Sequence, residues 1–146
     1  NRILVICTGN ICRSPMGEAL LARALGEDYS ISSAGIGALV GHEPDSHALE
    51  LMRERGIDIS AHRARQLSLD MVRGYDLLLT MDQDQSDWIH QQFAVARGRV
   101  YRFGHWRGMD VPDPYRRGRS AFEHALDLIE QGVADWQGRL ALPARP

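Results

Sequence analysis

Apolar residues form short continuous runs that alternate along the chain with sets at helical spacing. Residues 2–7 are a nearly unbroken apolar run, which predicts a strand buried on both faces, and residues 76–81 form a second such run. Further strands are predicted at 29–34 and 100–103. Helices are predicted between and after these strands, at residues 15–25, 46–55, 68–73, 84–93 and 120–140.

The ends of the predicted helices carry start and stop signals. Pro15 follows Ser14 and takes the first helical position, while Ser46 is the expected N-cap of the second helix and Gly56 its end. Strands that alternate with helices predict an α/β fold, a four-stranded parallel sheet with helices on both faces. Ligands bind such sheets at the carboxyl ends of the strands, where Cys7 stands.

The length of 146 residues fits one domain, predicted to cover residues 1–140, with a frayed tail at 141–146. A net charge of −2 favours neither nucleic acid nor anionic membrane as a partner, and no apolar run is long enough to span a bilayer. Two cysteines and six histidines without ligand spacing predict no metal site, no cofactor and no disulfide scaffold. A reducing, cytoplasmic location follows from this cysteine usage.

All 17 basic residues are arginine, and the sequence contains no lysine. This excludes a Schiff-base lysine and the lysine of a Walker phosphate loop. A long cationic side chain that holds phosphate in this chain is therefore expected to be an arginine.

The segment between the first strand and the first helix has the residue types that such a site needs. It is Cys-Thr-Gly-Asn-Ile-Cys-Arg-Ser, residues 7–14. The N–H groups from Thr8 to Arg13 can surround one phosphate if the loop curls, and Gly9 and Asn10 tolerate the positive φ that a curl requires. The following helix adds the positive end of its dipole, and the arginine can hold two phosphate oxygens.

The same electrostatic field acts on Cys7. Helix N-termini and nearby cations favour the thiolate form of a cysteine. We therefore predict a Cys7 thiolate that attacks phosphorus and forms a cysteinyl-phosphate, with Ser14 donating a hydrogen bond to the sulfur. The alternative is that Cys7 is a buried strand-end cysteine and Arg13 a surface charge, but the order strand, Cys-x5-Arg-Ser-Pro, helix favours function.

The stretch from Cys7 to Met16 resembles the signature of the low-molecular-weight protein-tyrosine phosphatases, and the likeness extends over about residues 2–140. The resemblance implies that Cys7 is the nucleophile and Arg13 the phosphate clamp. It also implies a hydrogen-bond network that shapes the loop, made by Asn10, Ser14, Ser33 and His62. Without the resemblance, the histidine would be interpreted as an exposed loop residue.

A general acid is needed to protonate the departing tyrosyl oxygen. Such an acid typically contributes ~100- to 10,000-fold in rate. Asp113 lies between two prolines that stiffen its loop, and its position before the last helix resembles the acid loop of the family. Asp110 is the second candidate for the general acid. The alternative without a function is that the segment around Asp113 is an ordinary proline-rich turn. Tyr115 then resembles the aromatic residue that stacks on the substrate ring.

Two positions bear on the substrate. At the position of Ile11 the chain resembles the tyrosine phosphatases of this family, whereas the branch that hydrolyses phosphoarginine looks to carry Thr there. The alternative is that Ile11 only packs the loop. Leu39, an aliphatic wall, and the segment 104–106 resemble the bacterial branch linked to exopolysaccharide and capsule export. That branch acts on the tyrosine-rich tail of a membrane-bound tyrosine autokinase. Seven arginines between residues 97 and 119 would suit a multiply phosphorylated tail, or form a solvated charged face.

Other readings of the sequence stay open or are excluded. Cys12 would form a reversible disulfide with Cys7, or serve as a small buried hydrophobic residue. Arsenate reduction is excluded because it needs cysteines after Cys12. Hydrolysis of phosphoarginine and a non-catalytic phosphopeptide-binding module remain alternatives. The expected assembly is a monomer or a weak dimer.

Overall fold

A computed structural model describes residues 1–140. Its strands are β1 (Arg2–Cys7), β2 (Ser30–Gly35), β3 (Leu77–Thr80) and β4 (Val100–Arg102). Its α-helices are α1 (Arg13–Leu25), α2 (Ser46–Glu54), α3 (Leu69–Gly74), α4 (Gln83–Gln92) and α5 (Arg119–Leu140). Short 3₁₀ turns occupy Gly26–Asp28, Ala94–Ala96 and His105–Arg107. The predicted tail at 141–146 lies outside the described residues.

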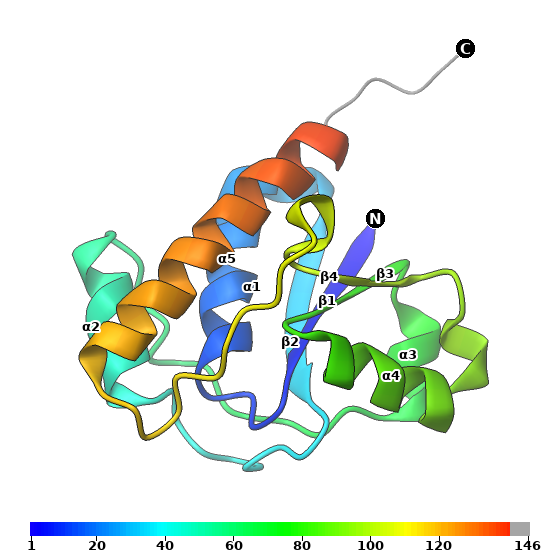
Figure 1. The fold of residues 1–146 in the computed structure, drawn as a ribbon, viewed down its shortest axis with the longest axis horizontal. Helices are drawn as coiled ribbons and strands as arrows, with labels where there is room; N and C mark the ends of the chain where they lie inside the picture. The colour runs from blue at the N-terminus through cyan, green and yellow to red at the C-terminus, as the bar shows by residue number, and fades with distance from the viewer. Residues whose placement is uncertain (141–146) are drawn as a thin grey trace.

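The strands form one parallel sheet in the order β2-β1-β3-β4. Helices α1, α2 and α5 lie on one side of this sheet, and α3 and α4 lie on the other (Figure 1). The predicted four-stranded parallel sheet with helices on both faces is therefore confirmed. Because β1 has a neighbour on each side, its carboxyl end stands in the middle of the sheet edge.

The apolar run of β1 divides between two cores. Ile3 and Val5 belong to the cluster that packs under α1, α2 and α5, whereas Leu4 and Ile6 belong to the cluster under α3 and α4. Successive side chains of a strand point to opposite faces, so a strand covered on both faces is apolar at every position. Burial of each such side chain stabilises the fold by roughly 1.5–3 kcal/mol. Together they fix the end of β1 and the loop that follows.

Several predicted helix boundaries were wrong by one or two residues. Helix α1 begins at Arg13 instead of Pro15, and no side chain caps it, because the Ser14 hydroxyl is turned toward Cys7. The cap of α2 is Asp45, which accepts from the N–H of His47, and not Ser46. At α1 a contact with the preceding strand therefore takes the hydroxyl away from a capping role, whereas at α2 the neighbouring residue Asp45 provides a local cap.

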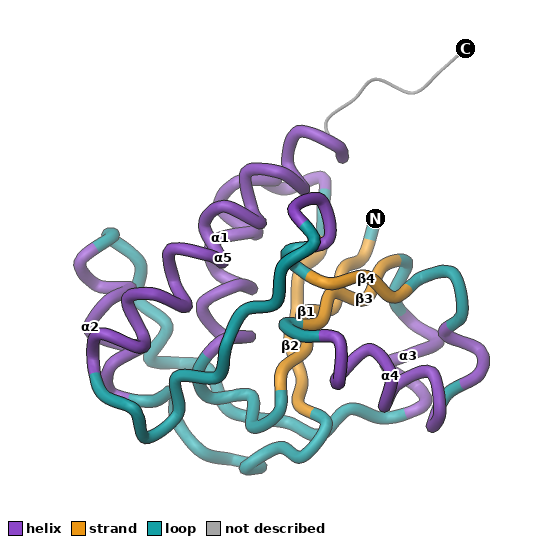
Figure 2. Tube along the Cα trace, in the orientation of Figure 1, coloured by secondary structure: helices purple, strands orange, loops and turns teal. Residues whose placement is uncertain are grey.

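Three loops gather at the carboxyl end of the sheet, at the bottom of Figure 2. They are the loop after β1, the loop after β2 and the long segment between β4 and α5. The close approach of the first two requires glycine at position 35, since a Cβ there would lie 2.5 Å from the carbonyl oxygen of Thr8. In the part of the chain that the structure describes, no helix combines the length and apolar character needed to cross a membrane.

Candidate active site

The loop after β1 curls back on the Cys7 sulfur. Cys7 is 2% exposed, and its Sγ lies 2.9 Å from the Ser14 hydroxyl and 3.3 Å from the N–H of Asn10. Asn10 has φ 59°, the left-handed conformation expected in the curl, whereas Gly9, the other residue suggested for it, does not have a positive φ. Within residues 1–140, the N–H groups of Gly9, Ile11 and Cys12 have no protein acceptor. These donors at the start of α1 are available to an anion.

The side chain of Asn10 connects the loop to its surroundings. Its Nδ2 donates to Ser14 Oγ at 2.7 Å and to Ser33 Oγ at 3.0 Å. Its Oδ1 accepts from the backbone N–H of Arg65 at 2.9 Å, and its carbonyl oxygen lies 2.8 Å from Nε2 of His62. Because a carbonyl can only accept, this histidine nitrogen carries the proton. The structure thus brings all four side chains of the predicted network together and adds the Arg65 backbone, which sequence reasoning missed.

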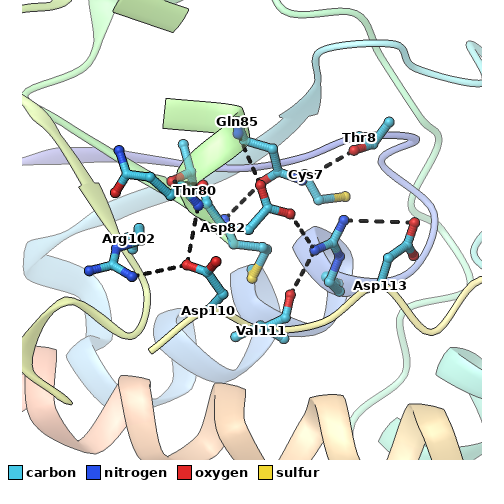
Figure 3. A network of polar contacts seen from close by, with 12 residues as sticks. Cys7, Thr8, Thr80, Asp82, Gln85, Arg102, Asp110, Val111 and Asp113 are labelled. Atoms are coloured by element: carbon cyan, nitrogen blue, oxygen red, sulfur yellow. Dashed lines mark hydrogen bonds and ion pairs between the residues drawn. The ribbon is translucent and has the colours of Figure 1, made fainter. Parts of the chain in front are cut away.

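The Arg13 guanidinium is buried and held from several sides. It is 2% exposed, and its Nη1 donates to Asp82 Oδ2 at 3.0 Å and to the carbonyl of Val111 at 2.8 Å. Its Nη2 lies 3.9 Å from Asp113 Oδ2. Dashed lines in Figure 3 lead from these three partners to the one guanidinium. A buried charge in this setting keeps one orientation, which a phosphate clamp requires.

The segment before α5 carries Asp113 to the same place. The N–H of Val111 donates to the Met81 carbonyl at 2.8 Å, which fixes the segment two residues before the acid. Asp113 is 53% exposed, and its Oδ1 accepts from the N–H of Tyr115 at 3.1 Å. Asp110, the second choice as acid, instead binds Arg102 at 3.0 Å and is turned away from the cysteine (Figure 3).

A pocket of about 230 Å³ opens over the cysteine loop. It brings together the predicted nucleophile, clamp and acid and the three predicted substrate contacts. Its lining residues are Cys7, Thr8, Gly9, Ile11, Cys12, Arg13, Gly37, Leu39, Asp113 and Tyr115. A charged base with apolar and aromatic walls suits a ligand that joins an anion to a flat apolar group.

Two residues at the start of α4 were missed by sequence reasoning. Asp82 Oδ1 caps the helix by accepting from the N–H of Gln85 at 2.9 Å, while its other oxygen holds Arg13. The Gln85 side chain accepts from the N–H of Met81 at 2.8 Å and donates to Thr8 Oγ1 at 3.2 Å. The sequence signal that could have identified both residues is the capping pattern Asp-x-x-Gln directly after a buried strand.

Cys12 is buried beside the nucleophile. Its side chain is 4% exposed, and burial raises the pKa of its thiol well above the ordinary value, with the nearby Asp45 carboxylate adding to the effect. Both cysteines are free thiols in the structure. A Cys7–Cys12 link therefore stays a prediction for oxidising conditions.

Fold and pocket together define a class of protein. A cysteine at the carboxyl end of a central parallel strand, inside an amide-lined loop with a fixed arginine, is the arrangement of a cysteine-dependent phosphatase. The family model for "Low molecular weight phosphotyrosine protein phosphatase" matches residues 2–143. The chain belongs to this family of phosphatases.

Known proteins agree with that assignment. The probable low molecular weight protein-tyrosine-phosphatase EpsP of Ralstonia nicotianae is 48% identical over 138 residues, covering 94% of each chain. The structure of Vibrio vulnificus Wzb in complex with benzylphosphonate is 39% identical with a TM-score of 0.91, and the match covers 95% of this chain and 98% of that one. The YwlE arginine phosphatase of Geobacillus stearothermophilus is 31% identical with a TM-score of 0.89, covering 95% of this chain and 92% of that one.

Proposed function

We propose that this protein hydrolyses phosphotyrosine in a protein substrate through a Cys7 phosphoenzyme. The observation that carries the proposal is the convergence of Cys7, Arg13 and Asp113 on one pocket. These three groups supply a nucleophile, an anion clamp and a proton donor, which are the parts that hydrolysis of an aryl phosphate needs.

The first step is attack of the Cys7 sulfur on phosphorus. The S–P bond forms as the P–O bond to the tyrosyl oxygen breaks, and Asp113 gives its proton to that oxygen. Arg13 and the free N–H groups of the loop bind the three remaining phosphate oxygens and stabilise the charge on them. The Ser14 hydroxyl, 2.9 Å from the sulfur, stabilises the thiolate before the attack and forms no covalent bond to the substrate.

The second step is hydrolysis of the cysteinyl-phosphate. Asp113 is now a carboxylate and takes a proton from water, whose oxygen attacks phosphorus while the S–P bond breaks. Inorganic phosphate leaves, and the thiolate and the protonated acid are restored. The partial exposure of Asp113 supports this role, because the acid must meet solvent water between the two steps.

The pocket favours phosphotyrosine over phosphoarginine. Ile11 and Leu39 present aliphatic surface, and Tyr115 presents a ring on which a phenyl group can stack. A guanidinium would lose hydrogen bonds to water against the aliphatic surface of Ile11 and Leu39, which offers no side-chain acceptor. Phosphoarginine hydrolysis is the second candidate function because a relative that is 31% identical is an arginine phosphatase.

Turnover of matched peptides tests the proposal. The kcat/KM on a phosphotyrosine peptide should exceed that on the same peptide with phosphoarginine. Asp113→Asn should lower kcat/KM on the phosphotyrosine peptide by ~100-fold or more. Asp110→Asn, which removes an equal charge from the same loop, should have a far smaller effect. Equal losses in the two variants would contradict the assignment of the acid.

The physiological substrate follows from the branch that the chain resembles. We infer that it is the tyrosine-rich cytoplasmic tail of a membrane-bound tyrosine autokinase that controls exopolysaccharide or capsule export. The aliphatic Leu39 and the segment 104–106 support this branch. Cys7→Ser should bind the phosphorylated tail without turning it over. Failure of the variant to bind this tail, with normal wild-type activity on model peptides, would exclude the autokinase and keep the chemistry.

A further inference from the structure

The structure separates the seven arginines between residues 97 and 119 by what they contact. Four hold the protein together: Arg99 donates to three backbone carbonyls, Arg102 binds Asp110, Arg107 binds Asp135, and Arg119 binds Glu50 and Glu54. Arg97 lies before β4, at the edge of the sheet opposite the pocket. Two arginines remain, Arg116 and Arg117.

These two arginines directly follow Tyr115, a residue of the pocket wall, in the chain. Within residues 1–140, neither side chain has a hydrogen-bond acceptor or a carboxylate partner. The Arg116 guanidinium carbon lies 5.1 Å from the centre of the Tyr115 ring, and Tyr115 lines the pocket. The nearest acid in sequence, Asp113, already faces Arg13. Two arginine side chains without a protein acceptor among residues 1–140 thus follow this wall residue, and the guanidinium of Arg116 lies against its ring.

The backbone at Arg116 supports a functional role for this turn. Among the described residues, only Asn10 and Arg116 have positive φ without being glycine, at 59° and 62°. The first of them shapes the phosphate loop. Such conformations cost free energy for an L-amino acid and concentrate at functional sites. At this turn, an arginine instead of glycine places a guanidinium against the aromatic wall of the pocket.

We propose that Arg116 and Arg117 bind a second anionic group of the substrate, close in sequence to the phosphotyrosine that enters the pocket. This inference rests on the proposed function and adds to it a preference for substrates with acidic or multiply phosphorylated segments. Guanidinium groups pair with carboxylates and, more strongly, with phosphates, because a phosphate has more charge and more acceptor oxygens.

Three peptides test this, each with one phosphotyrosine and with alanine, glutamate or phosphoserine on both sides of it. The wild-type kcat/KM should rise in that order, by about 5-fold or more from the first to the last at low salt, as expected for exposed ion pairs. The rise should shrink at 1 M salt, where charges are screened within ~3 Å. Glutamate and phosphoserine distinguish a carboxylate ligand from a phosphate ligand.

The variant to compare is Arg116→Asn with Arg117→Gln, since asparagine tolerates the left-handed backbone. It should bring the ratio of kcat/KM between phosphoserine and alanine peptides toward one. The control Arg73→Gln with Arg97→Gln removes two exposed charges far from the pocket and should keep the wild-type ratio. Unfolding midpoints of both variants check that the fold is retained.

The outcomes separate the proposals. No peptide preference in the wild type, or an equal loss on all three peptides in the Arg116 and Arg117 variant, overturns the anion site. If Arg73→Gln with Arg97→Gln lowered the kcat/KM ratio between phosphoserine and alanine peptides as much as Arg116→Asn with Arg117→Gln, the preference would come from the net charge of the protein. That result would also overturn the anion site. Failure of the wild type to hydrolyse even the alanine peptide would instead overturn the proposed phosphatase activity on tyrosine.

Discussion

Substitution of Asn10 separates the two ways in which this residue holds the phosphate loop. Its side chain makes three hydrogen bonds, buried ones to Ser14 and Ser33 and a partly buried one to the N–H of Arg65, and its backbone has a positive φ. Asn10→Ala removes the hydrogen bonds and leaves a Cβ in a left-handed conformation. Asn10→Gly removes the same hydrogen bonds but relieves the backbone.

The structure sets the size of both effects. Three hydrogen bonds at roughly 1 kcal/mol each give a loss of about 3 kcal/mol in the free energy of unfolding for Asn10→Gly. Asn10→Ala should lose about 1 kcal/mol more, because alanine pays for the left-handed conformation. Glycine is therefore expected to be the more stable replacement here, which reverses the order found in helix interiors.

Urea unfolding of the wild type and both variants measures these differences. Ala134→Gly, at an exposed position of α5, is the matched control and should destabilise by about 1 kcal/mol. Both Asn10 variants should also lower kcat, since the loop amides no longer hold their positions. Equal stability of Asn10→Ala and Asn10→Gly, or losses below 1 kcal/mol in both, would refute the network as the support of the loop.

Three further changes test neighbouring parts of the site. Asp82→Asn keeps the helix cap but removes the charge that holds Arg13, and should lower kcat/KM about 10-fold. Gln85→Leu removes the acceptor for Met81 and the donor to Thr8, and should lower the free energy of unfolding by about 2 kcal/mol in urea titrations. Burial raises the pKa of Cys12, so this thiol should stay protonated and resist iodoacetamide at pH 8.5, where an ordinary free thiol is half ionised, until urea exposes it.

Each of these expectations has a control or a contradicting result. Asp84→Asn removes a charge from the first turn of the same helix without touching Arg13, so a similar loss there would argue for a general effect of charge. Thr8→Val should reproduce only part of the Gln85→Leu loss, because the bond to Met81 remains. Modification of Cys12 in the folded protein as fast as in urea would contradict its burial.

The sequence predicted the fold because its signals are local. The apolar runs at β1 and β3 and the helical spacing of α5 depend on neighbours a few residues away. Helix starts were predicted less well. The hydroxyl of Ser14, a capping residue type, contacts the Cys7 sulfur instead, so a tertiary contact overrode the local preference. At α2 the neighbouring Asp45 is the cap in place of Ser46.

The contacts of Arg13 could not be predicted in the same way. Asp82 follows β3, and it reaches the arginine because β3 is the neighbour of β1 in the sheet. Strand order in a parallel sheet depends on crossover connections and not on any single segment. The Val111 carbonyl carries no side-chain signal at all. The loop motif thus predicted the family, while the groups that orient Arg13 required the three-dimensional structure.

The central claim is that the Cys7 sulfur becomes covalently bonded to phosphorus during turnover. Rapid quenching of the wild-type protein within its first turnover of a phosphotyrosine peptide, followed by peptide mass mapping, measures this directly. We predict a phosphate adduct on Cys7 that forms before free phosphate appears and is absent in Cys7→Ala, which should have no turnover. Phosphate release by Cys7→Ala, or an adduct on any other residue, would contradict this claim.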